Sequence, residues 1–248
     1  MEKAIIMFEL IDRDANGRIC KLTIGNHTIK TPTIMPVINP NKTLIKAEEM
    51  KKFGAEIVIT NSYIIKSASL SGDVHKIINW DGLVYTDSGT FQMFSHGITD
   101  LDAEVMVDFQ NKIKSDIVTP VDMFTLPDDS KKIALEKLNE TSLRVFTARQ
   151  LTQTLVGPIQ GGLFLDLRKK ACKEIAKANP DVFAIGGIVP LMEQYRYKEL
   201  FDIVLTCKEN LPAGVPVHAF GAGHPMIFAP LVAFGCDLFD SRRNVTHI

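Results

Sequence analysis

Three aspartates stand where apolar runs end, and carboxylates in such places can serve as acids, bases or nucleophiles. Asp87 follows LVYT, Asp122 closes IVTPVD, and Asp240 closes CDLFD. Removing an unpaired charge from water is costly, so buried strands rarely end on a carboxylate without a reason. Carboxylates held close together also push their pKa values apart, which makes separate acid and base roles possible. The pattern favours a catalytic site over three unrelated turns.

Each polar residue taken alone also has an ordinary structural interpretation. Asp87 precedes Ser88 and a glycine, a combination that is typical of a turn or a helix cap. Gln160 alone is typical of a satisfied polar group, Phe91 of a core aromatic, and His218 of a packed histidine. A glutamine and three carboxylates on one rim are harder to explain as turns, and this combination favours the catalytic interpretation.

Continuous apolar runs are the elements that must position these residues. They cover residues 33–38, 57–63, 83–89, 117–123, 154–162, 182–188, 216–223 and 236–241. Continuous rather than alternating apolar character is typical of parallel strands that are buried on both faces. Most of the intervals have helical patterns, so strand and helix alternate along the chain. We therefore predict an α/β fold, a (β/α)8 TIM barrel, with its active site at the C-terminal ends of the strands.

A doubly wound parallel sheet is the structural alternative. That fold places a glycine-rich loop after its first strand, whereas the segment PVINPNKT has no glycine. Several helix boundaries can also be predicted: Thr43 and Gly54 bound one helix, Ser130 precedes a long one, and Pro225 and Gly235 bound another.

The first 32 residues differ from the rest of the chain. Asn16-Gly17 and Gly25-Asn26 separate short β runs, which predicts antiparallel hairpins that lead into the barrel. We therefore expect N-terminal hairpins over residues 1–32 and the barrel over residues 33–248. Only RRNVTHI follows the eighth run, so we expect the barrel to be incomplete after strand eight in this chain.

Composition limits the classes of function. The chain has 248 residues and a formal net charge of −1, whereas a protein that held nucleic acid by bulk attraction would be basic. Its 4 cysteines form no CxxC pair, which favours reduced thiols in a cytoplasmic protein over a zinc cluster or a disulfide framework. The longest strongly apolar stretch, residues 225–236, is too short to span a bilayer, so we expect no membrane contact.

Four motifs in order carry a resemblance to a known family. They are DSGTFQMF (87–94), PIQGG (158–162), IGGIVPLME (185–193) and HAFGAGHPM with GCDLFDS (218–241). With them the chain resembles a tRNA-guanine transglycosylase, most of all the archaeal, archaeosine-type branch. The resemblance implies a transferase of queuosine or archaeosine biosynthesis. Such an enzyme replaces guanine in tRNA by a 7-deazaguanine, here 7-cyano-7-deazaguanine, through a covalent aspartyl-ribosyl intermediate.

The resemblance also implies two catalytic roles. The nucleophile of the family falls on Asp240 in FDS, and the general acid/base falls on Asp87 in DSG. The chemistry agrees, because base exchange at the anomeric carbon passes through an oxocarbenium-like transition state that a carboxylate can stabilise and capture. A second carboxyl group can then manage the protons of the departing and arriving bases.

Base binding is implied for a second set of residues. Guanine offers N1–H and N2–H donors, which suit Asp122, and an O6 acceptor, which suits Gln160 and a backbone N–H. An aromatic ring, here Phe91, stacks on the base in the family. A buried nucleotide must flip out of its stack to reach such a pocket. The substrate-binding residues implied in this way are Ser88, Phe91, Asp122, Gln160, Gly187 and Ile188.

The sequence departs from the family after the nucleophile. The family pattern continues into a zinc subdomain with clustered cysteines and a histidine, and then into the last barrel helix. This chain has RRNVTHI instead, so we expect no metal or cofactor in it. We expect its partners to be tRNA, the 7-deazaguanine base and a second polypeptide that completes the barrel and the zinc site. A non-catalytic, transglycosylase-like subunit is the alternative function, and a barrel enzyme for a small sugar or nucleoside is a third.

Overall fold

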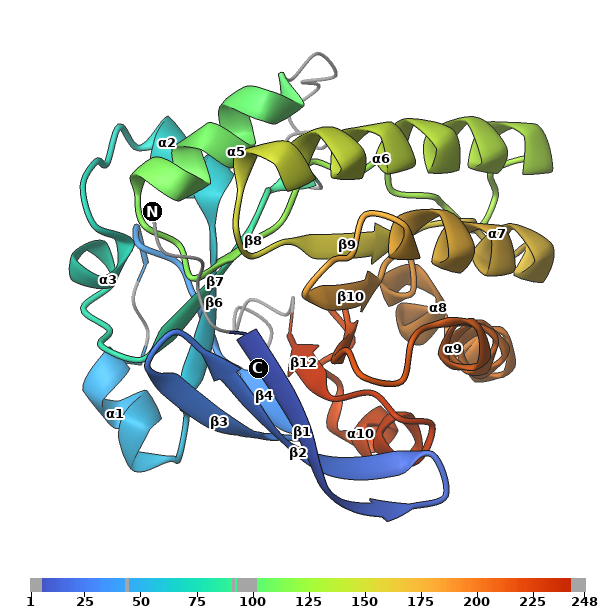
Figure 1. Ribbon diagram of the computed structural model, residues 1–248, viewed down its shortest axis with the longest axis horizontal. Coiled ribbons are helices and arrows are strands. Elements are labelled where there is room, and N and C mark those ends of the chain that lie inside the picture. The colour runs from blue at the N-terminus through green and yellow to red at the C-terminus, as the bar shows by residue number, and fades with distance from the viewer. Residues whose placement is uncertain (1–5, 43–44, 91, 93–101, 242–248) are drawn as a thin grey trace.

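The computed structural model describes residues 6–42, 45–90, 92 and 102–241 (Figure 1). Every apolar run that was expected to form a barrel strand does so. In chain order these strands are β4 (Thr33–Met35) with β5 (Val37–Ile38), β6 (Ile57–Asn61), β7 (Leu83–Asp87), β8 (Ile117–Val118), β9 (Val156–Ile159), β10 (Val182–Ile185), β11 (Val217–Ala219) and β12 (Leu238–Asp240). β4 and β5 are two parts of one strand, interrupted at Pro36.

The strands pair in parallel, in the order of a barrel. One sheet has the order β5-β6-β7-β8, and another has the order β4-β12-β11-β10-β9. The strand made of β4 and β5 joins the two sheets on one side. On the other side, a single parallel bridge between Val118 and Leu155 joins β8 to β9. Each strand therefore lies beside its neighbours in sequence around a ring, which confirms the predicted fold class and is not the strand order of a doubly wound sheet.

Helices pack around the outside of the strands (Figure 1). Those that the structure describes are α1 (Ala47–Lys52), α2 (Ser62–Ser67), α3 (Val74–Ile77), α5 (Ala103–Lys112), α6 (Lys131–Leu151), α7 (Leu165–Ala176), α8 (Val189–Glu193), α9 (Tyr197–Asn210) and α10 (Pro225–Ala233). As predicted, Ser130 caps α6 with its hydroxyl group, and Pro225 is the first residue of α10. The described part of the first helix begins at Ala47, and Thr43, its predicted start, lies outside the described residues.

An N-terminal sheet closes one end of the barrel. Its strands β1 (Ile6–Asp14), β2 (Gly17–Ile24) and β3 (His27–Thr31) pair antiparallel, as the turn signals predict. Leu22, Ile24 and Ile29 join the apolar cluster inside the ring, which includes Met35 and Tyr85. This sheet therefore shares a core with the barrel strands.

An ion pair fixes the hairpins at the N-terminal ends of the strands. Arg18 of β2 bonds to buried Asp237, just before β12, with Nε–Oδ1 and Nη2–Oδ2 distances of 2.8 and 2.7 Å. Asp237 also accepts a 2.7 Å hydrogen bond from the N–H of Val217, the first residue of β11. Because the hairpins cover this end, the C-terminal ends of the strands remain available for a site.

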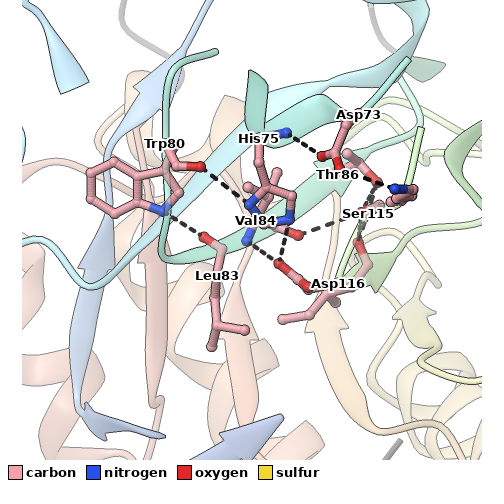
Figure 2. Close-up of polar contacts among 10 residues, drawn as sticks. Asp73, His75, Trp80, Leu83, Val84, Thr86, Ser115 and Asp116 are labelled. Carbon is pink, nitrogen blue, oxygen red and sulfur yellow. Dashed lines mark hydrogen bonds and ion pairs between the residues drawn. The ribbon is translucent and has the colours of Figure 1, made fainter. Parts of the chain in front are cut away.

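A polar network at the same end sets the position of β7 (Figure 2). Asp116, the residue before β8, accepts a 2.7 Å hydrogen bond from the N–H of Val84 and lies 3.3 Å from Nε2 of His75. Nδ1 of His75 in turn lies 3.2 Å from the carbonyl oxygen of Trp80. The hydrogen bond to Asp116 raises the pKa of His75 above its ordinary value of 6.5. This network anchors the start of the strand whose far end is Asp87.

Candidate active site

The C-terminal ends of the strands surround a cavity of about 390 Å³. The predicted site residues that line it are Asp87, Asp122, Gln160, Gly187 and Asp240. Asp87 and Asp122 follow strands of one sheet, whereas Gln160, Gly187 and Asp240 follow strands of the other. The structure thus brings carboxylates from both sheets to one cavity.

Asp87 ends β7, beside Asn61, which ends β6. The side-chain amide of Asn61 donates a 3.2 Å hydrogen bond from Nδ2 to Oδ2 of Asp87. Burial, the largest cause, and the like charges of Asp122 and Asp240 raise the pKa of Asp87 to about 7, although two backbone N–H groups oppose the shift. A carboxyl group with this pKa can both give and take a proton at neutral pH.

Asp122 and Gln160 form a paired acceptor and donor on the cavity wall. Nε2 of Gln160 donates to Oδ2 of Asp122 at 2.6 Å. The N–H and hydroxyl groups of Thr125 both donate to Oε1 of Gln160, at 3.1 and 3.0 Å, and so fix which end of the amide faces Asp122. Burial raises the pKa of Asp122, whereas the hydrogen bond from Gln160 opposes that shift. The pair suits a planar ligand with neighbouring N–H donors and a carbonyl acceptor.

Two glycines after β10 leave the backbone itself as part of the wall. A Cβ on Gly186 would lie 2.3 Å from Nε2 of Gln160. Gly187 has a φ of 69°, and a Cβ there would lie 3.0 Å from the carbonyl oxygen of Thr125. A side chain at either position would displace the groups that hold Asp122 and Gln160 together.

Asp240 ends β12 and is held through one carboxylate oxygen. Oδ1 accepts hydrogen bonds from Nε2 of His218 at 2.8 Å and from the N–H of Gly221 at 2.6 Å. Nδ1 of His218 lies 3.2 Å from the hydroxyl group of Tyr85, and burial keeps the pKa of Tyr85 well above its ordinary value. Tyr85 and His218 thus form a buried chain of contacts that ends at Asp240. Two hydrogen bonds therefore fix the orientation of the Asp240 carboxylate through Oδ1.

The remaining predicted residues have different positions. Ser88 is buried behind the wall, where its hydroxyl group lies 3.0 Å from that of Thr90. The side chain of Ile188 is fully buried in the core between the strands and the helices, and Ile188 is not among the residues that line the cavity. Phe91 lies outside the described residues, and its stacking role stays a prediction.

Sequence reasoning missed three residues that support the site. His218 is packed, as expected for a buried histidine, but it also holds Asp240. Thr125 fixes the amide of Gln160, a contact that no local pattern indicates. Arg168 stands on the buried face of α7, and a charged residue at such a position was a signal that could have identified it.

The described residues contain neither a candidate metal-ligand cluster nor a helix suited to crossing a membrane. Within residues 6–42, 45–90, 92 and 102–241, no group of three or more His, Cys, Asp or Glu side chains could hold a metal ion. The free, buried cysteines there do not offer the ligand set of the zinc subdomain that the resemblance implies. No helix among these residues combines the length and apolarity that a membrane crossing requires.

Comparisons with known proteins identify the family of the chain. Residues 12–245 match the sequence model of the queuine tRNA-ribosyltransferase family. The chain is 48% identical over 244 residues to the tRNA-guanine(15) transglycosylase of Methanosarcina barkeri, across 95% of this chain and 50% of the relative. It is 46% identical over 242 residues to the enzyme of that name from Archaeoglobus fulgidus, across 94% of this chain and 50% of the relative.

A third relative is more distant in sequence but matches as much of the chain. The tRNA-guanine(15) transglycosylase of Pyrococcus furiosus is 42% identical over 245 residues, across 96% of this chain and 42% of the relative. The chain thus spans about half the length of the first curated relatives that it matches. From the extent of the family match and these identities, the chain belongs to the queuine tRNA-ribosyltransferase family.

Proposed function

We propose that this chain carries the base-exchange centre of a tRNA-guanine transglycosylase. In this proposal it replaces a guanine of tRNA by a 7-deazaguanine, and the names of the relatives favour guanine 15 as the position. The observation that carries the proposal is the single cavity that Asp87 and Asp240 share with the Asp122–Gln160 pair. Two carboxyl groups for the chemistry and one donor–acceptor pair for the base are the parts that this reaction requires.

In the first half-reaction, Asp240 is the nucleophile. Oδ2 of Asp240 attacks C1′ of the ribose while the bond between C1′ and N9 of guanine breaks. The carboxylate faces an oxocarbenium-like carbon and stabilises it before the ester bond forms. Asp87 gives its proton to the departing guanine, because a pKa of about 7 keeps a large fraction of this carboxyl group protonated at neutral pH.

The second half-reaction runs through the same groups in reverse. The incoming 7-deazaguanine gives its N9 proton to the Asp87 carboxylate, and N9 attacks C1′ while the ester bond to Asp240 breaks. Asp240 regains its carboxylate and Asp87 regains its proton, so charge and protons balance over the cycle. Two displacements at C1′ retain the configuration of the sugar.

Base recognition falls to the paired wall residues. Guanine and 7-deazaguanines share N1–H and N2–H donors, which suit the carboxylate of Asp122, and an O6 acceptor. The amide of Gln160 can donate to O6, because Thr125 already occupies its oxygen. The backbone N–H of Gly187 is the second donor that we propose for O6. We propose 7-cyano-7-deazaguanine as the incoming base, from the resemblance to the archaeosine-type branch.

The outer face of the first barrel strand is the contact surface that we propose for a second polypeptide. Ile34 and Phe239 are partners in the pairing of β4 with β12. Phe228 of α10 packs on Phe239, which is 3% exposed, whereas Ile34 is 44% exposed. Outer faces of barrel strands are normally covered by helices, and this exposure supports a further polypeptide element beside β4. If such an element belongs to a second polypeptide, less of that polypeptide should co-purify with Ile34→Lys than with the unchanged chain. This substitution does not alter the residues of the exchange site.

Trapping of the covalent intermediate tests the proposed chemistry. The chain is incubated with tRNA and denatured, and a covalent protein–RNA adduct is sought. We expect an adduct with the unchanged chain and none with Asp240→Asn, which removes the nucleophilic charge. Asp202→Asn, at an ion pair on the outer surface of α9, is the matched control and should form the adduct normally.

Each result of this experiment separates the candidate functions. An adduct that persists in Asp240→Asn would show that another group is the nucleophile. A chain that binds guanine but forms no adduct with tRNA, alone or with a co-purified partner, would favour the non-catalytic subunit. A chain that binds no guanine at all would contradict the proposed pocket.

A further inference from the structure

A fully buried arginine lies directly behind the cavity wall. Arg168, in the first turn of α7, is 0% exposed. Its Nε donates to the carbonyl oxygen of Gly162 at 2.9 Å, and its Nη1 donates to those of Ile159 and Gly186, each at 2.8 Å. Its Nη2 is buried without a hydrogen-bond partner in the described part of the chain. Burying a charge is costly unless it is paired and hydrogen-bonded, and one nitrogen of this guanidinium group has no such partner among the described residues.

We propose that Arg168 is a positioning residue for base recognition. It holds the carbonyl groups at the ends of β9 and β10 and thereby aims the N–H of Gly187 at the bound base. This inference rests on the proposed function, because it concerns how the same pocket orients a purine.

Peptide geometry supplies the link between Arg168 and the cavity. The carbonyl of Gly186 and the N–H of Gly187 belong to one planar trans peptide, so they point in opposite directions. Since the carbonyl points at Arg168, the N–H points away from it, and Gly187 lines the cavity. The carbonyl of Ile159 and the N–H of Gln160 form a second peptide that is held in the same way.

A single nitrogen holds the two strands together at this point. Nη1 of Arg168 bonds to carbonyls that follow neighbouring strands, and Ile159 also accepts the 3.1 Å hydrogen bond from the N–H of Gly186. Hydrogen bonds from a cation are stronger than neutral ones and polarise the peptides that accept them. The same contact therefore fixes the direction of the Gly187 N–H and strengthens it as a donor.

Lysine cannot reproduce this arrangement. The guanidinium group is a planar fork whose nitrogens reach three carbonyls in fixed directions, whereas an ammonium group is a compact point charge. Arg168→Lys keeps the positive charge and most of the volume but loses the fork. This variant therefore tests position separately from charge.

Arg149 provides a matched control at the opposite end of the same strands. Its side chain donates to the carbonyls of Thr152 and Gln153 before β9 and to that of Asn179 before β10. It also pairs with Asp181 at 2.9 Å. Arg149→Lys disturbs the same two strands through the same kind of contact, but far from the cavity.

Calorimetry measures the affinities of the unchanged chain and of Arg168→Lys for guanine and for 6-thioguanine, and Arg149→Lys is the control. Guanine and 6-thioguanine carry the same donors, but sulfur replaces O6 and is a weak acceptor. We expect Arg168→Lys to weaken guanine binding about 10-fold and 6-thioguanine binding about twofold or less, since the lost interaction involves O6. Arg149→Lys should leave the ratio of the two affinities as it is in the unchanged chain.

A second measurement needs no ligand. The amide proton of Gly187 should move upfield in the NMR spectrum of Arg168→Lys, because its peptide loses a charged donor, and it should stay in place in Arg149→Lys. An equal loss of affinity for both purines, or an unmoved Gly187 amide, would overturn the proposal and leave Arg168 a purely structural residue.

Measurements on the unchanged protein provide two further tests. If the Arg168 variants do not fold, the Nε–H signal of Arg168 should still shift on titration with guanine and not with 6-thioguanine, and identical shifts would overturn the proposal. If the unchanged chain binds neither purine, the proposed function fails, and this inference fails with it.

Discussion

Nε2 of His218 lies 2.8 Å from Oδ1 of Asp240, and the hydroxyl group of Tyr85 holds the other nitrogen of the same imidazole. All three side chains are buried. The orientation of the proposed nucleophile therefore depends on this buried histidine.

His218→Phe should slow adduct formation without weakening base binding. It removes a hydrogen-bond donor to the proposed nucleophilic carboxylate, a loss of about 1.5–3 kcal/mol, which corresponds to roughly 10–150-fold in rate. His218→Gln can place an N–H near the position of Nε2 and should recover part of that rate. Single-turnover adduct formation and guanine calorimetry check the two effects, and an unchanged rate in His218→Phe would remove His218 from the site.

Asp87→Asn should abolish exchange and yet stabilise the fold at alkaline pH. The folded-state pKa of Asp87 is raised from 3.8 to about 7, so the folded protein prefers the protonated form. Stability is therefore lost as pH rises from about 3.8 to about 7, because the unfolded chain releases this proton in that range whereas the folded protein keeps it. Asparagine avoids this loss. The Tm of Asp87→Asn should exceed that of the unchanged chain at pH 8 and match it at pH 4, and a constant difference would contradict the raised pKa.

Asp122→Ala should chiefly weaken the binding of guanine or a 7-deazaguanine. It leaves purine N–H donors unpaired in a buried pocket, which costs about 1–3 kcal/mol, or roughly 5–150-fold in affinity. Calorimetry with the free base measures this loss directly, and Asp202→Ala on the outer surface is the control. Equal affinities of the unchanged chain and Asp122→Ala would exclude Asp122 from base recognition.

The contribution of His75 to stability should fade as pH rises. Its hydrogen bond with Asp116 raises the folded-state pKa above 6.5, so the stabilisation is fully present below about pH 6.5 and is lost as pH rises through the folded-state value. His75→Gln should therefore lower the Tm most at pH 6 and progressively less toward pH 8. A Tm difference for His75→Gln that does not vary with pH would disprove the assignment.

The sequence predicts the strands better than the contacts between them. Continuous apolar runs identify every barrel strand because burial on both faces leaves that pattern, and the turn pairs at Asn16 and Gly25 identify the hairpins. Because the active site of such a barrel lies at the C-terminal ends of its strands, Asp87 and Asp240 are then predicted to lie on one rim. Boundaries are less certain: β8 is limited to Ile117–Val118, where a longer run was expected, because the chain beyond it turns to form the cavity wall.

The supporting residues could not be found in this way. Arg168 acts on carbonyls 6, 9 and 18 positions away, and His218 meets a residue 22 positions away. Such contacts depend on how strands pair in three dimensions and leave no local period in the sequence. A charge on the apolar face of α7 and a histidine inside a buried strand are the only traces that they leave.

β8 and β9 share one backbone bridge, between Val118 and Leu155, and beyond it side chains link the two sides, as Gln160 bonds to Asp122. Asp122 follows β8 and Gln160 follows β9, so a purine that bonds to both would add a further connection across this joint. Occupancy of the pocket would then slow hydrogen exchange at the bridge itself.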